Sequence, residues 1–176
     1  RSRGKIGVIG HSHMDTAWLW PVSETIRKCA RTYSQTLNLM EMYPDYTFMQ
    51  SSALHLDWMR EYYPDIFEGI KKRVAEGRYE PNGGVWVECD CNITGGESMV
   101  RQFLYGQRYT MKHLGYKSDS FWLPDTFGYS AAIPQIMLGS GVKYFYTTKM
   151  DWGDLNKFPA HSFVWRGLDL SLIHIS

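Results

Sequence analysis

The first group of chemically active residues follows the apolar run at residues 5–10, where His11, His13 and Asp15 alternate along the chain. If this segment is extended, alternate side chains point to the same face, so the three could converge. Imidazole nitrogen and carboxylate oxygen together suit zinc or a similar divalent ion. The alternative is structural: the histidines hydrogen-bond in the core and Asp15 caps the following helix. The alternation by itself leaves both interpretations open.

A carboxylate elsewhere in the chain favours the interpretation of this group as a metal site. Asp90 follows another apolar segment, at residues 84–89, and a metal site needs a further ligand from a second element. Cys89 and Cys91 flank Asp90 and raise the alternative of thiolate ligands. On a strand, however, both would point away from the face that holds Asp90, so we expect them to pack in the core.

Two further residues could contact a substrate. Trp18 comes shortly after Asp15. Tryptophan most often packs in a core, but in a polar pocket its ring is a good platform for the C–H face of a sugar. Asp125 follows a third apolar segment, at residues 120–123. It could cap a helix or orient a substrate, and the sequence does not choose between these roles.

Alternating elements would position these residues. Apolar runs predict strands at 5–10, 46–50, 84–89, 120–123 and 144–148. Three- and four-residue spacing predicts helices at 22–40, with Ser23 as N-cap, at 53–78 with a break at Pro64, at 97–114 with a stop at Gly115, and at about 131–138. This alternation indicates an α/β fold in which crossover helices join parallel strands, whose carboxyl ends hold the candidate site.

Composition narrows the class of protein. The chain has 176 residues, enough for one domain, and 19 Lys+Arg against 18 Asp+Glu give a formal charge of +1. This balance predicts no nucleic-acid partner and no attraction to an anionic membrane surface, and the apolar runs are too short to span a membrane. The odd count of three cysteines suits a reducing compartment, and residues 1–10 show no secretory signal. We therefore expect a cytoplasmic protein.

Several motifs together resemble family 38 of the glycoside hydrolases, the zinc-dependent retaining α-mannosidases. They are, in order, HSHMDTAWLWP at 11–21, GGVWVECDCN at 83–92, WLPDTFGYS at 122–130, and NKFP at 156–159 with FVWRG at 163–167. The resemblance extends over about residues 5–169. The first motif is most similar to the cytosolic and bacterial branch of the family.

The resemblance implies a role for each matching residue. The family's zinc-binding pair falls on His13 and Asp15, which leaves His11 as a neighbour. The nucleophile, which is also a zinc ligand, falls on Asp90, and the tryptophan that packs on the sugar falls on Trp18. Family members hold two mannose hydroxyls on zinc and form a glycosyl ester on the aspartate. A retaining glycosidase also needs an acid/base carboxyl about 5–5.5 Å from the nucleophile.

Parts of the family pattern have no match here. The resemblance places the acid/base carboxyl and a last zinc-binding histidine beyond residue 176, and a complete β/α barrel takes about 250 residues. We therefore expect residues 1–169 to form a partial β/α barrel of about five strands, inactive alone, and residues 170–176 to be a non-native tail. A mannose-containing glycan is the expected partner, and a homo-oligomer of the intact protein is left open.

Two alternative functions compete with this interpretation. A metal-dependent amidohydrolase or deacetylase also begins its site with His-x-His after the first strand. Such enzymes need further histidines after later strands, and the segments ending at Gln50, Leu123 and Thr148 lack them. A catalytically inactive sugar-binding fragment is the second alternative.

Overall fold

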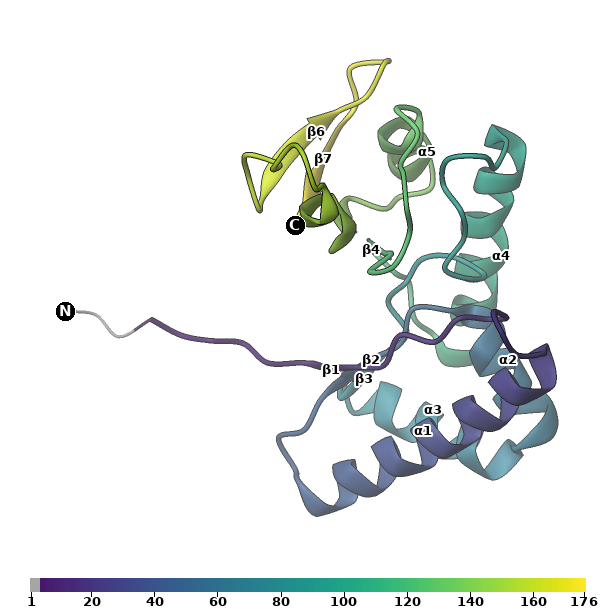
Figure 1. Ribbon diagram of the computed structural model, residues 1–176. Coiled ribbons are helices and arrows are strands. Elements are labelled where there is room, and N and C mark those ends of the chain that lie inside the picture. Colours follow the sequence, from purple (N-terminus) through teal and green to yellow (C-terminus); the bar gives the residue numbers. More distant parts are fainter. Residues whose placement is uncertain (1–3) are drawn as a thin grey trace.

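The computed structural model describes residues 4–176, which form a mixed α/β structure with two sheets (Figure 1). The first sheet is parallel throughout, in the order β1-β2-β3: Gly10–His11, Phe48–Met49 and Tyr79–Glu80. The second sheet has the order β4-β5-β7-β6: Ser120–Trp122, Tyr144–Tyr146, Leu172–Ile175 and Phe163–Arg166. Its β4-β5 and β5-β7 pairs are parallel, and β6 runs antiparallel to β7.

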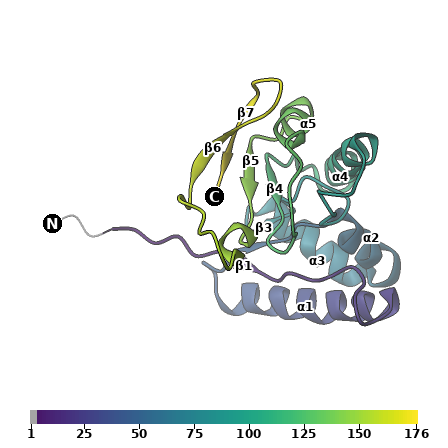
Figure 2. The ribbon, with the colours of Figure 1, turned by 45° about the horizontal axis from the view of Figure 1, so that its top comes forward.

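Helices cover each sheet separately. The helices α1, α2 and α3 span Val22–Met42, Ala53–Tyr62 and Pro64–Ala75, and they share a hydrophobic core with the first sheet. The helices α4 and α5 span Gly96–Leu114 and Ile133–Gly139 and pack against the second sheet (Figure 2), and a short 3-10 helix, η1, spans Lys149–Trp152. No helix within residues 4–176 combines the length and apolarity that a membrane crossing requires.

Local signals explain where these helices begin and end. The break predicted at Pro64 is confirmed, because proline occupies the first turn of α3, where its missing N–H is not needed. Gly115 ends α4 as predicted, with a left-handed φ of 64° that glycine adopts without steric cost. Ser23 does not cap α1: the N-cap is Pro21, and Ser23 lies inside the first turn.

Two predicted strands differ from the structure. Of the segment 5–10, only Gly10 lies in a strand, the two-residue β1, and Ile6 and Val8 are 90% and 86% exposed on an arm that runs away from the body (Figure 1). An apolar run becomes a strand only where a neighbour pairs with it, and nothing within residues 4–176 does so there.

The segment 84–89 is also not a strand. Val85 forms one isolated bridge with Ser52, and the third strand is instead the two-residue β3. Gly83 and Gly84 explain the path of the backbone before Val85. A Cβ on Gly83 would lie 1.7 Å from the Ser51 carbonyl oxygen, and Gly84 has a φ of 75°. The chain therefore turns tightly against residue 51 rather than extending.

Residues 170–176 have a place in the sheet. β7 lies between β5 and β6, and Ile173 and Ile175 are buried in the core of the second sheet. The predicted non-native origin of residues 170–176 is untested and stays a prediction.

The expected partial barrel is not confirmed. The two sheets are not closed, and no continuous ladder joins them within residues 4–176. Side chains nevertheless connect their ends, because the Trp122 indole N–H at the end of β4 donates to His11 Nε2 on β1 over 3.2 Å. The segments that follow β1 and β4 therefore start close together, and they carry the candidate site.

Candidate functional site

His13 is the centre of a cluster of ionisable side chains just beyond β1. Its Nε2 lies 3.5 Å from Asp15 Oδ1 and 3.3 Å from Asp125 Oδ2, and its Nδ1 lies 2.5 Å from Glu88 Oε2. His13, Asp15 and Asp125 each offer a ligand atom, and the three atoms all lie within 4.8 Å of one another. Residues more than a hundred positions apart thus form one group that could hold a metal ion.

The spacing of these atoms fits a zinc-sized ion. Two ligand atoms about 2.0–2.2 Å from a tetrahedral ion lie about 3.3–3.6 Å apart, which matches both distances from His13 Nε2. This nitrogen is buried and has no hydrogen-bond partner within the described residues. The pKa of His13 is raised to about 8, chiefly by its contact with Glu88 and further by the charges of Asp15 and Asp125, whereas burial opposes the shift. The surroundings therefore favour a positive charge, which a metal ion would supply in place of a proton.

Asp125 is held by a cation. Lys149 at the start of η1 places its Nζ 2.7 Å from Asp125 Oδ1, so Oδ2 is the oxygen that faces His13. The ammonium also lies 3.0 Å from the centre of the Trp152 ring and 5.0 Å from that of Phe127. Asp125 belongs to the metal-capable group. Whether it also orients a substrate stays a prediction.

The two histidines of the first motif have different surroundings. His11 Nδ1 lies 3.0 Å from the Met49 carbonyl oxygen, to which it can donate, and its Nε2 accepts the hydrogen bond from Trp122. Burial chiefly lowers the pKa of His11. Both ring nitrogens are therefore engaged in joining β1 to β2 and β4, and the metal-capable group contains His13 and not His11.

Asp90 lies outside this group. Its side chain is exposed, and Oδ1 accepts hydrogen bonds from the backbone N–H groups of Asn92 and Ile93, both at 2.8 Å. This is a local turn of the kind aspartate forms with the residues that follow it. Cys89 and Cys91 are buried, so the prediction that they pack in the core is confirmed. The role of Asp90 as nucleophile and ligand stays a prediction.

Trp18 is not a core residue. It is 67% exposed and packs edge to face with Trp20, with ring centres 5.4 Å apart. The Trp20 indole N–H donates to Thr25 Oγ1 on α1 over 3.0 Å, which anchors the pair. The Trp18 ring is therefore available to a ligand, although a role in sugar binding stays a prediction.

Two residues of the cluster were missed from sequence. Glu88 was part of a motif without a role, and Lys149 was not singled out. For Glu88 a signal existed, because it stands two positions before Asp90 and alternate residues share a face of an extended segment. For Lys149 the signal was its place directly after the predicted strand at 144–148, but only the fold brings η1 to Asp125.

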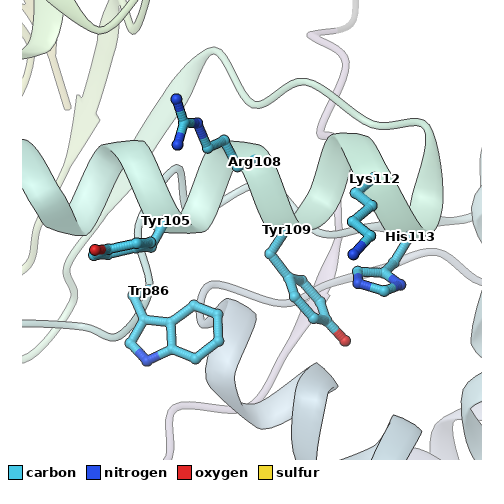
Figure 3. A pocket seen from close by; sticks show the side chains of 6 residues that line it. All are labelled: Trp86, Tyr105, Arg108, Tyr109, Lys112 and His113. Carbon is cyan, nitrogen blue, oxygen red and sulfur yellow. The ribbon is translucent and has the colours of Figure 1, made fainter.

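A separate hollow of about 480 Å³ lies along α4 (Figure 3). Aromatic and basic side chains line it: Trp86, Tyr105, Arg108, Tyr109, Lys112 and His113. None of the predicted site residues belongs to it. This hollow therefore does not coincide with the candidate metal centre.

Comparisons with known proteins agree with the motifs. The family model described as glycosyl hydrolases family 38 N-terminal domain matches residues 3–175. Alpha-mannosidase 2C1 of Homo sapiens is 49% identical over 175 residues, which cover 98% of this chain and 17% of that protein. An alpha-mannosidase of Saccharomyces cerevisiae is 46% identical over 162 residues, covering 92% of this chain and 15% of the relative. The chain thus spans about a sixth of these relatives.

Solved structures share the fold. An alpha-mannosidase from Enterococcus faecalis V583 superposes with a TM-score of 0.78 at 23% identity, covering 95% of this chain and 19% of that one. A 4-alpha-glucanotransferase from Thermococcus litoralis reaches 0.73 at 16% identity, covering 95% and 26%. Because the family model matches almost the whole of this chain, the chain belongs to the N-terminal domain family of the family 38 glycosyl hydrolases.

Proposed function

We propose that the intact protein containing this chain is a retaining α-mannosidase that removes terminal α-D-mannosyl residues from glycans in the cytoplasm. The observation that carries the proposal is the metal-capable group of His13, Asp15 and Asp125. This group occurs in a chain that belongs to a glycosidase family, and the similar proteins are named alpha-mannosidases. In the intact protein we propose that the two sheets are part of a β/α barrel, with this group at the carboxyl ends of its strands.

In this proposal His13 and Asp15 hold zinc, with Asp90 as the third ligand that the resemblance implies and Asp125 beside them. When bound, the ion would bind sugar hydroxyls and favour the ionised form of nearby carboxylates. Trp18 would pack against the C–H face of the mannose. Lys149 keeps one oxygen of Asp125 occupied, so the other stays directed towards His13.

The chemical step is a double displacement at the anomeric carbon. The Asp90 carboxylate forms a bond to this carbon while the glycosidic C–O bond breaks, and the leaving oxygen takes a proton from an acid carboxyl outside residues 1–176. Water then attacks the glycosyl ester and gives its proton to the same carboxyl, which releases mannose and free Asp90. Residues 1–176 alone would supply the nucleophile and the sugar-binding side but no proton donor.

The amidohydrolase alternative needs both histidines of the first motif as ligands. The structure disfavours it, because both nitrogens of His11 are engaged with Met49 and Trp122. The sugar-binding alternative makes a different prediction, since a binding module forms no covalent intermediate.

Kinetics of an Asp90 variant in the intact protein test the proposal. Asp90→Asn should abolish hydrolysis of an aryl α-mannoside, a loss of several orders of magnitude because it removes the covalent step. It should also prevent labelling by a fluorinated mannosyl trapping reagent, whereas Asp65→Asn, at the exposed start of α3, should label normally. More than a few per cent residual activity, with deamidation excluded, would overturn the assignment.

A further inference from the structure

Glu88 is a buried carboxylate with few partners. Its side chain is 8% exposed, Ser51 Oγ donates to its Oε1, and its backbone N–H donates to Ser52 Oγ over 3.3 Å. Within residues 4–176 its ion-pair partner is His13, whose Nδ1 lies 2.5 Å from Oε2. Burying a carboxylate is costly unless it is paired, so the fold commits this charge to His13.

The contact decides which nitrogen of His13 is free. A neutral imidazole carries its proton on one nitrogen, and a carboxylate beside Nδ1 favours the proton there. The lone pair is then on Nε2, the nitrogen that faces Asp15 and Asp125. We propose that Glu88 is a positioning residue: it fixes the orientation and tautomer of His13 so that Nε2 is presented as a metal ligand. The metal-binding role of His13 itself rests on the proposed function.

Other roles for Glu88 fit the geometry less well. It does not belong to the group of atoms that could share one ion, because it approaches His13 from the Nδ1 edge of the ring. Its Oε1 accepts a hydrogen bond from Ser51, its Oε2 lies 2.5 Å from His13 Nδ1, and its side chain is almost fully covered. A ligand or an acid acting on the sugar would need a free oxygen facing the site.

The charge of the cluster agrees with this role. With neutral His13, the carboxylates of Asp15, Glu88 and Asp125 outnumber the ammonium of Lys149, so the cluster carries a net negative charge that attracts a divalent cation. Carboxylates behind metal-binding histidines are a common arrangement, and their loss typically lowers metal affinity about 10–100-fold.

Two measurements on the intact protein that contains this chain test the inference. The first is zinc affinity, by competition with a chromophoric chelator, for the wild type, Glu88→Gln and the control Glu97→Gln, whose side chain is 76% exposed on α4. We expect Glu88→Gln to bind zinc about 10–100-fold more weakly at a temperature where circular dichroism shows that the variant without metal is folded, and the control to match the wild type.

The second measurement is the tautomer of His13 without metal, read from the ¹⁵N shifts of the imidazole at about pH 9.5, where the ring is neutral. The wild type should carry the proton on Nδ1, and Glu88→Leu should move it to Nε2. The role of Glu88 would be overturned if the wild type and Glu88→Gln bound zinc with equal affinity. It would also be overturned if the wild type carried the proton on Nε2. Either result would leave the proposed function standing. Absence of zinc binding in the wild type would overturn the metal-ligand role of His13, and with it this inference.

Discussion

Replacing His11 and His13 separately by alanine should affect different properties of the protein. His13→Ala removes the only nitrogen of the metal-capable group, which leaves the carboxylates of Asp15 and Asp125. Since losing even a supporting contact costs about 10–100-fold in metal affinity, loss of a ligand should cost at least about 100-fold. Zinc added at a hundredfold excess over its dissociation constant stabilises the wild type by about 2.7 kcal/mol, and this gain should disappear in His13→Ala.

His11→Ala should instead weaken the fold. It removes the contact with the Met49 carbonyl and the hydrogen bond from Trp122, and it leaves the indole N–H without its acceptor. Two such bonds contribute about 0.5–1.5 kcal/mol each, so the free energy of unfolding should fall by about 2 kcal/mol. For a chain of this size that lowers the melting temperature by about 4–8 °C. Zinc affinity should stay within about threefold of the wild type.

Thermal melts with and without zinc, together with chelator competition, separate the two variants. His161→Ala is the matched control, because its imidazole is 90% exposed and lies outside the cluster. Equal loss of zinc in His11→Ala and His13→Ala would refute the reasoning and favour the His-x-His site of an amidohydrolase. Unchanged zinc binding in His13→Ala would remove the candidate metal centre altogether.

Two further predictions concern the scaffold. Gly106→Ala should destabilise the protein by about 1–3 kcal/mol or more, because the added Cβ on α4 would lie 2.3 Å from the Val85 carbonyl carbon. The control Gly139→Ala, whose Cβ would meet nothing within 4 Å, should leave the free energy of unfolding nearly unchanged. Chemical denaturation measures both variants. His55 is buried, and desolvation lowers its pKa from 6.5 to about 4. The unfolded chain therefore binds the proton more readily, and stability should fall by up to about 3 kcal/mol as the pH drops from 6.5 to 4. Melts at pH 7 and 4.5 should show a smaller drop for His55→Gln than for the wild type; an equal drop would contradict the role of His55.

The helices follow from local sequence. Hydrophobic spacing predicted all the long helices, and Pro64 and Gly115 ended them where expected, because these signals act within a single turn. The buried face of α1 does not follow from residue type alone: Val22 is 42% exposed, whereas Thr25 and Cys29 are fully buried. Spacing locates a helix, but its packing partners decide which side is covered.

The strands depended on distant partners. A strand is stabilised by the neighbour it pairs with, and a two-residue strand such as β3 carries almost no local signal. The run at 5–10 has a strand-like sequence and yet lies exposed beyond Gly10, whereas Leu172–Ile175 pairs on both sides within the second sheet. Pairing, which the sequence does not display, decided both outcomes.

The candidate site divides in the same way. The motifs in the sequence indicated the family, and the resemblance, rather than the spacing, predicted His13 and Asp15 as the metal-binding pair. Only the tertiary structure brought Asp125 to His13 and assigned Glu88 and Lys149 to the cluster. It also engaged both nitrogens of His11 in the fold. The physical reason is that ligand geometry depends on which strand ends the fold brings together, and residues distant in sequence meet only there.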